Sequence, residues 1–348
     1  SALWPFSTLG WPHNTEDLKT FYPTNVLVTG YDIIFFWVAR MIFSGLESMK
    51  QKPFSDVLIH GIVRDSQGRK MSKSLGNGID PIEVIEKYST DALRFSLILG
   101  ISPGNDIKYM PEKLEQASNF ANKLWNAAEI ASRADLSVEE LPEINIAKLE
   151  YEDKWILSKL NTLVKEVTEN FDNYELGIAT QKIYDFIWNE FCDWYIEIVK
   201  TRLYGADKES KLTAQIVLNE VLKNALKLLH PIMPFITEEI YQQLYNIDES
   251  IMISEFPKYS FKFDFKDEES KIEKLKEIIV GIRNIRANLN VHPSKKADLT
   301  FVTKTNKDIM EKSKNFLKKL GYSDNIKVQD NKDGIAQNAM SIITDEIE

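Results

Sequence analysis

Residues 68–78 read Gly68-Arg69-Lys70-Met71-Ser72-Lys73-Ser74-Leu75-Gly76-Asn77-Gly78, and the rest of the chain can be interpreted outward from them. The stretch holds three cations, two hydroxyls and three glycines, and only Met71 and Leu75 are apolar. Such a segment cannot bury one face of a helix or strand, so it predicts a mobile loop. Glycines let a backbone approach a ligand closely, and Lys70 and Lys73 carry charges on flexible stems. This chemistry suits a polyphosphate, although the P-loop spacing is absent; a solvated basic loop is the alternative.

The composition is that of an ordinary globular chain. Of the 348 residues, 43% are hydrophobic and 27% are charged, and this length allows two or three domains. The single cysteine, Cys192, excludes an internal disulfide and a cysteine zinc site, and its apolar neighbours predict a core position. We find no membrane span or signal peptide, so we expect a cytoplasmic protein without a membrane partner. The formal net charge of −9 argues mildly against nucleic acid, although a local basic patch is compatible with it.

The segment before the loop predicts a strand, a helix and a second strand. Residues 26–30 and 57–63 are short apolar runs, and residues 31–50 have helical periodicity between them. In such a βαβ unit, ligands bind beyond the carboxyl ends of the strands. Gly30 and Asp32 follow the first strand and the loop follows the second, so we expect these segments to meet at one crevice. Asp32 could instead only cap the helix.

The string K-M-S-K-S at 70–74, followed by L-G-N and by Asp91-Ala92-Leu93-Arg94, resembles the second signature of class I aminoacyl-tRNA synthetases. The resemblance implies that Lys70 and Lys73 are catalytic and stabilise the phosphates of ATP while an aminoacyl-adenylate forms. Catalysis would then rest on electrostatics and positioning, with Mg²⁺ arriving bound to ATP. His60, which the resemblance places near the adenine of ATP, could equally be a hydrogen-bonded core residue. The ATP-binding residues that the resemblance implies are Gly30, Asp32, His60, Gly61, Lys70, Met71, Ser72, Lys73 and Ser74.

The amino acid is indicated by three strings, at 1–12, 30–41 and 102–106, which resemble the valine-specific members of the class. The isoleucine and leucine members are the alternatives. The resemblance implies that Asp32 binds the ammonium group of valine, that Ile33 and Trp37 line its side-chain pocket, and that 104–106 lies near the active site. Either apolar residue could instead pack in the core.

The sequence from residue 111 onward predicts mostly helices. Residues 111–133 have helical periodicity, 134–153 form an acidic linker, and four amphipathic stripes follow as a bundle. A helix at about 268–290 and a small strand–helix–strand unit end the chain. We expect the C-terminal half of a Rossmann-like catalytic domain at 1–106, a connecting helix and linker at 107–153, an anticodon-binding helical bundle at 154–262, and a helix with a small α/β unit at 263–348.

Four cations and no acid lie between positions 281 and 296, which is the best local patch for nucleic acid in this acidic chain. They are Arg283, Arg286, Lys295 and Lys296, and we predict that they contact tRNA-Val. A solvated helix face is the alternative. We also expect a monomer.

The first class I signature, H-x-G-H, is missing, because the four histidines lie at 13, 60, 230 and 292. We therefore expect a C-terminal fragment that lacks the first half of the catalytic domain and the editing domain, and that is inactive alone. The alternative is a stand-alone tRNA-binding module with a relict nucleotide fold.

Overall fold

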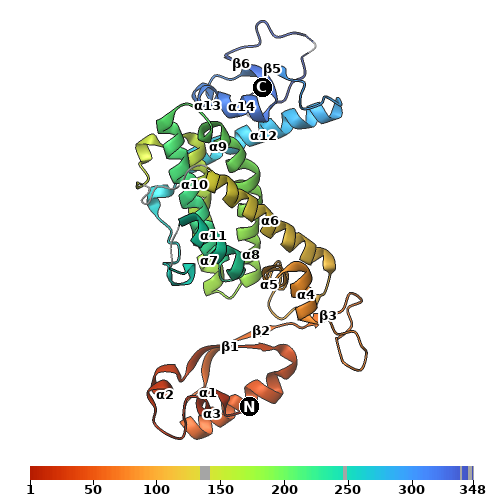
Figure 1. The fold of residues 1–348 in the computed structure, drawn as a ribbon, viewed down its shortest axis with the longest axis vertical. Coiled ribbons are helices and arrows are strands. Elements are labelled where there is room, and N and C mark those ends of the chain that lie inside the picture. The colour runs from red at the N-terminus through yellow and green to blue at the C-terminus, as the bar shows by residue number, and fades with distance from the viewer. Residues whose placement is uncertain (134–141, 246–248, 338, 344–346, 348) are drawn as a thin grey trace. The chain divides into compact units, whose positions relative to one another are not determined.

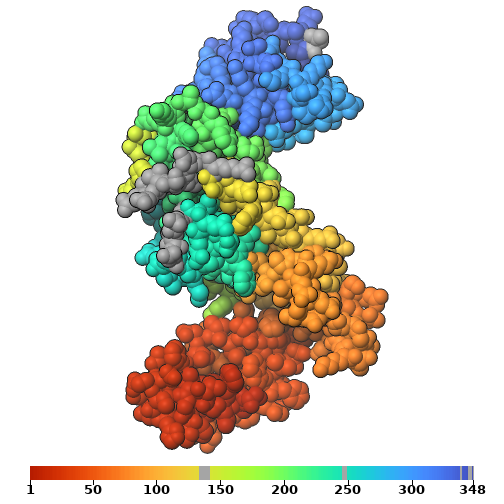
Figure 2. Space-filling model, in the orientation of Figure 1, coloured from red at the N-terminus to blue at the C-terminus, as the bar shows by residue number. Residues whose placement is uncertain are grey.

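The computed structural model describes residues 1–133, 142–245, 249–337, 339–343 and 347. The chain divides into two compact units. Their elements are drawn, coloured by residue number, in Figures 1 and 2. Unit 1 comprises 1–118 and 169–181, and unit 2 comprises 119–168 and 182–348. No helix in the described ranges is both long enough and apolar enough to cross a bilayer.

Unit 1 is organised around two parallel strands, β1 (Thr24–Gly30) and β2 (Phe54–His60). Their register pairs Thr24 with Phe54 at one end and Gly30 with His60 at the other. The connection between them carries α3 (Ala39–Met49), and α1 (Trp4–Ser7) and α2 (Glu16–Phe21) precede β1. The predicted βαβ arrangement is therefore confirmed.

The helix predicted from residue 31 begins differently from the expectation. A 3₁₀ turn, η1 (Tyr31–Ile33), leads into a π-helical segment, η2 (Ile34–Val38), before regular α-helix starts. The buried side chain of Val38, at the end of this segment, packs with Met41 of α3 and Phe54 of β2. A second small cluster, Phe6, Leu18 and Tyr22, packs the aromatic start of the chain. A π-turn inside a helix is rare and frequently marks a functional site.

Two short helices follow the signature loop. Asp80 caps α4 (Pro81–Tyr88) by accepting a 2.8 Å hydrogen bond from the Ile82 amide, and Pro81 occupies the first helical position. Ser89 caps α5 (Thr90–Ser96) in the same way. The short strands β3 (Val63–Arg64) and β4 (Ile107–Lys108) pair in parallel, so the predicted second strand is interrupted at 61–62.

The remaining helices agree with the periodic stripes of the sequence. They are α6 (Pro111–Arg133), α7 (Tyr151–Asp172), α8 (Leu176–Asp185), α9 (Ile196–Leu203), α10 (Lys208–Leu229), α11 (Pro234–Tyr245) and α12 (Lys266–Asn288). A π-helical segment, η4 (Phe186–Tyr195), joins α8 to α9. Short 3₁₀ turns lie at Ile146–Lys148, Ile251–Ile253 and Phe261–Phe263. Residues 134–141 of the predicted acidic linker lie outside the described residues. Its predicted end at 153 is wrong, because residues 151–153 already belong to α7.

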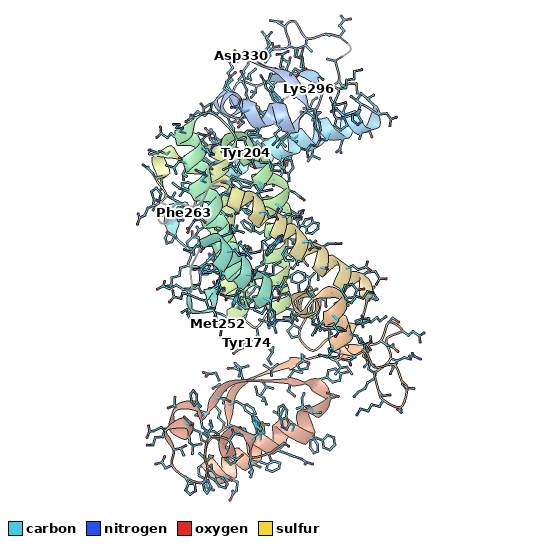
Figure 3. The ribbon with its side chains drawn as sticks, in the orientation of Figure 1. Tyr174, Tyr204, Met252, Phe263, Lys296 and Asp330 are labelled. Carbon is cyan, nitrogen blue, oxygen red and sulfur yellow. The ribbon has the colours of Figure 1, made fainter. Side chains whose placement is uncertain are left out.

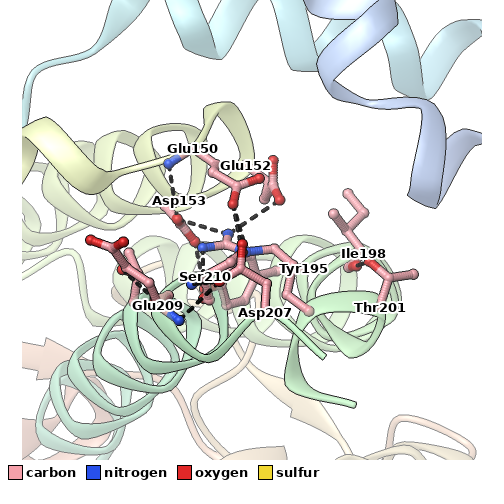
Figure 4. A network of polar contacts seen from close by, with 11 residues as sticks. Glu150, Glu152, Asp153, Tyr195, Ile198, Thr201, Asp207, Glu209 and Ser210 are labelled. Atoms are coloured by element: carbon pink, nitrogen blue, oxygen red, sulfur yellow. Dashed lines mark hydrogen bonds and ion pairs between the residues drawn. The ribbon is translucent and has the colours of Figure 1, made fainter. Parts of the chain in front are cut away.

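A buried ionic network joins the start of α7 to α9 and α10 in unit 2 (Figure 4). Arg202, whose side chain is only 8% exposed, lies 2.8 Å from Asp153 and 3.2 Å from Glu152, both of which are also buried. Its Nε donates a 2.8 Å hydrogen bond to Ser210, and Glu150 lies 3.2 Å away. Three carboxylates thus face one guanidinium, and burial raises the pKa of Glu152 to about 7.

The chain ends in a small parallel sheet that packs within unit 2. Strands β5 (Ala297–Val302) and β6 (Ser323–Gln329) are joined by α13 (Lys307–Lys312) and α14 (Lys314–Leu320). The predicted strand–helix–strand order is confirmed, with the helix divided at Ser313. Cys192 is buried, as predicted.

Candidate nucleotide site and candidate RNA-binding face

The carboxyl ends of β1 and β2 bring three of the predicted ATP-binding residues together. Gly30 and His60 are register partners, and a Cβ built on Gly30 would lie 2.9 Å from Asp32 Oδ1 and 3.6 Å from His60 Cε1. The exposed His60 ring donates through Nδ1 to the Gly61 carbonyl at 2.7 Å, because a carbonyl can only accept. This edge therefore offers a backbone surface flanked by a carboxylate and an imidazole.

The signature loop reaches the same edge. Lys70 Nζ lies 3.0 Å from Asp32 Oδ2, and the two side chains remain 62% and 33% exposed. Lys73 and Ser74 are exposed further along the loop. An open hollow is lined by Met71, Ser72, Lys73, Gly76, Gly78 and Ile79. The expected meeting of the two segments is confirmed, and a cationic side chain stands beside a carboxylate in a solvent-accessible position.

Asp106 joins the segments around this edge. Its carboxylate accepts hydrogen bonds from the Ile62 amide at 2.8 Å, from Tyr31 Oη at 3.1 Å and from Arg64 Nε. The Ile62 amide makes the largest contribution to holding the pKa of Asp106 below its usual value. Sequence reasoning placed 104–106 near the site only through resemblance, and it missed Tyr31 and Arg64. The residues that neighbour Tyr31 and Arg64 in sequence give no sign that both side chains contact Asp106, because these contacts depend on the alignment of β3 with β4.

A tight backbone contact supports the Asp106 arrangement. A Cβ on Gly61 would lie 2.0 Å from the carbonyl oxygen of Asn105 and 2.6 Å from the Asp106 amide nitrogen. Only glycine allows the end of β2 to approach the 102–106 segment so closely.

The two predicted pocket residues differ in their surroundings. Trp37 is half-buried and packs against the cluster of Val38, Met41 and Phe54. Ile33 is 40% exposed beside Asp32. Both lie on the 3₁₀ and π-helical turns, so their separation is not that of an α-helix. Packing in the core therefore explains the buried part of the Trp37 side chain. It does not explain the position of the Ile33 side chain, which is 40% exposed.

The predicted basic patch of unit 2 divides into two pairs. Arg286 is only 9% exposed, donates to the carbonyl oxygens of His292 (3.0 Å) and Lys295, and lies over the ring of Tyr322. Arg283 Nε donates to the Leu320 carbonyl at 3.1 Å. These contacts favour a structural role for both arginines, at the junction of α12 with α14.

Lys295 and Lys296 are the exposed pair of the patch. Lys296, labelled in Figure 3, lies 3.0 Å from Asp324, and the two side chains are 55% and 61% exposed. An ion pair this exposed exchanges readily for another partner such as a phosphate. The lysines are therefore the accessible candidates for RNA.

Comparison with known proteins decides the family. Residues 1–110 match the model for tRNA synthetases class I (I, L, M and V), and residues 153–301 match the anticodon-binding domain of tRNA ligase. The valine–tRNA ligase of Clostridium acetobutylicum is 53% identical over 99% of this chain, and that of Clostridium perfringens is also 53% identical over 99%. The chain belongs to the class I synthetases, in the valine–tRNA ligase family.

This synthetase chain spans 39% of the length of each of those two relatives. A solved structure with the same fold is the LeuRS of Agrobacterium radiobacter K84 in a ternary complex with tRNA and LeuAMS, with a TM-score of 0.62 and 19% identity over 75% of this chain and 32% of that one. The predicted fold class, part of a class I catalytic domain followed by a helical anticodon-binding domain, is confirmed. Lys70 and Lys73 lie in the synthetase match, and all four basic candidates lie in the anticodon-binding match.

Proposed function

We propose that the whole protein joins valine to tRNA-Val in the cytoplasm, and that these residues supply one half of the ATP and valine site together with tRNA-binding surface. The observation that carries the proposal is the convergence of Lys70 and Asp32 at the strand ends, 3.0 Å apart, in a chain of this family. A site that brings both charges to one edge suits a substrate pair carrying phosphates and an ammonium group.

In the first step, the carboxylate of valine attacks the α-phosphorus of ATP, forming valyl-adenylate and releasing pyrophosphate. Negative charge develops on the phosphates, and we propose that Lys70 and Lys73 stabilise it there. Because Lys70 would leave Asp32 to do so, the carboxylate becomes available to the ammonium group of valine. Mg²⁺ is proposed to enter with ATP as part of the substrate. Among the described residues, no group of three His, Cys, Asp or Glu could hold a metal ion.

In the second step, the valyl group passes from the adenylate to tRNA-Val, releasing AMP. The support for tRNA as partner is the anticodon-binding match over 153–301 and the exposed Lys295 and Lys296. Ile33 and Trp37 are proposed to line the side-chain pocket, and a monomer is the proposed working form.

The test is ATP–pyrophosphate exchange by the whole protein with valine, isoleucine or leucine, followed by aminoacylation of a tRNA-Val transcript. Exchange that depends on valine and far less on the other two is expected. Faster exchange with isoleucine or leucine than with valine would overturn the proposal. So would the absence of exchange with all three amino acids. The isolated 348 residues are expected to give no exchange, because they contain no H-x-G-H signature.

A further inference from the structure

The signature loop has little apolar packing to hold it. Lys73, Ser74, Leu75 and Gly76 are all exposed, and Leu75 is 61% exposed. A segment of this kind is ordered only if polar contacts at its base fix both ends. The contacts that do so converge on Asp65 and Asn77, which we call the loop-base pair.

Asp65 organises the first arm of the loop. Its Oδ1 accepts hydrogen bonds from the amides of Arg69 (2.8 Å) and Gln67 (3.1 Å), and its Oδ2 accepts one from Arg69 Nε at 2.8 Å. The residue is 6% exposed. These bonds close a tight turn in which Arg64 and Lys70 face each other as an antiparallel bridge.

Asn77 connects the second arm to the first. Its Nδ2 donates to Asp65 Oδ2 at 2.9 Å and to the Lys70 carbonyl at 3.3 Å, and its Oδ1 accepts from the Ser72 amide at 2.9 Å. The side chain therefore contacts the backbone on both sides of Met71. A primary amide is the group that offers a donor and an acceptor in this arrangement. The bond from Asn77 is also the largest cause of the low pKa of Asp65, which keeps that carboxylate ionised as an acceptor.

We propose that Asn77, acting through Asp65, is a positioning residue of the activation step: it fixes the backbone at Lys70 and Ser72 so that the Lys70 and Lys73 ammonium groups are presented to the phosphates. The role in activation rests on the proposed function, whereas the ordering of the loop does not. Asn77 itself need not touch substrate, because its three bonds are all used within the loop.

The first test compares Asn77→Ala with a matched control, Ser66→Ala, in the whole protein. Ser66 is exposed at the tip of the same turn. Because misplacing a catalytic group by about 1 Å can cost about 100-fold, we expect kcat for exchange to fall about 10- to 100-fold with Asn77→Ala while KM for valine changes less than about threefold. Ser66→Ala should stay within about twofold of the unchanged protein. Equal rates for the two variants, or a loss confined to KM for valine, would overturn the proposal.

The second test measures the loop directly and does not depend on activity. Trypsin cuts after Arg69, Lys70 and Lys73, and cleavage requires the loop to open. Asn77→Ala should raise the cleavage rate at these positions at least about fivefold, with the cooperative thermal transition of the protein unchanged. An unchanged cleavage rate would overturn the proposal. If the unchanged protein shows no exchange with any amino acid, the proposed function fails, and the cleavage rates alone then decide whether Asn77 orders the loop.

A third variant, Asn77→Asp, separates the loss of the donor from the loss of volume. It keeps an acceptor for the Ser72 amide and places a second carboxylate beside Asp65, with the Arg69 guanidinium as the nearby cation. Two carboxylates sharing one site raise the pKa of one of them, and the proton bound there restores a donor. We expect its activity, relative to the unchanged protein at each pH, to recover as pH falls from about 8 to about 6. A ratio that is flat across this range would overturn the assignment of the donor bond as the ordering contact.

Discussion

Lys70 Nζ and Asp32 Oδ2, which are 38 residues apart in sequence, lie 3.0 Å apart at the carboxyl ends of two parallel strands. A pair this exposed contributes about 0–1 kcal/mol to stability, so its presence is better explained by the site than by the fold. Under the proposed function, we expect the phosphates of ATP and the ammonium group of valine to compete with this ion pair.

Replacement of Lys70 tests this directly. Lys70→Ala should lower kcat for valine-dependent exchange by about 100- to 1,000-fold, the usual cost of removing one group that stabilises transition-state charge. The measurement is the initial rate of pyrophosphate exchange in the whole protein. Lys52→Ala, which removes an exposed lysine from the same unit, should leave the rate within about twofold. Similar losses in both variants would contradict a specific role for Lys70.

The close approach of Gly61 to Asn105 predicts a local loss of stability. Gly61→Ala would place its methyl group 2.0 Å from a backbone oxygen, so the end of β2 and the 102–106 segment must separate. We expect about 1–3 kcal/mol of local destabilisation, measured as faster amide hydrogen exchange at 57–62 and 105–108. Gly78→Ala is the control, because nothing lies within 4 Å of the Cβ it adds. Equal exchange rates in the two variants would contradict the steric argument.

The buried network of unit 2 predicts that stability depends on pH. The pKa of Glu152 is about 7 in the folded protein and near 4.5 when unfolded, so the folded state binds more protons between those values. The free energy of unfolding should therefore fall as pH rises from about 5 to about 8. Asp153, whose pKa burial also raises, acts in the same direction. Urea titrations at about pH 5.5, 6.5 and 7.5, following a helical signal, measure this slope.

Glu152→Gln should flatten that dependence, because the amide cannot ionise. Glu143→Gln, at an exposed position, should retain the full slope. A free energy of unfolding that stays constant or increases with pH over this range in the unchanged protein would contradict the raised pKa of Glu152.

The two halves of the basic patch should respond differently to substitution. Lys295→Ala or Lys296→Ala should weaken the binding of tRNAs of any sequence to a similar extent, because a phosphate contact does not read the bases. Each variant should also lower the slope of log affinity against log salt by about 1 for each phosphate that it no longer neutralises. Arg286→Ala should instead lower thermal stability, because it removes hydrogen bonds to two backbone carbonyls and the stacking on Tyr322. Filter binding at two salt concentrations and thermal unfolding separate the two effects. A larger effect of Arg286→Ala than of the lysine variants on the salt slope would contradict the division.

Several features of the fold and site could be predicted from sequence because they depend on local patterns. The apolar runs at 26–30 and 57–63 predicted the two parallel strands, and the polar residues of 68–78 predicted the loop. Strand-end geometry then predicted that the segments of Asp32 and Lys70 would meet. Each of these inferences needs only neighbouring residues and a general rule.

Other features could not be predicted because they depend on contacts between distant segments. Arg283 and Arg286 look like a basic surface in sequence, yet tertiary packing turns them toward carbonyls and Tyr322. Asn77 reads as a turn residue, and its partner Asp65 is identified only by the folded loop. The π-helical turns also leave no signal, since Ile33 and Trp37 keep an ordinary helical spacing in sequence.

Those π-helical turns make the candidate pocket sensitive to the number of residues as well as to their kind. Removing one residue between Ile34 and Val38 would allow the segment to wind as regular α-helix, in which each residue advances by about 100°. The side chains before the deletion, Asp32 and Ile33, would then rotate about the helix axis relative to Trp37 although none of the three had been replaced. If Ile33 and Trp37 line the pocket as proposed, we expect such a deletion to change which amino acid is activated even though every proposed pocket residue is retained.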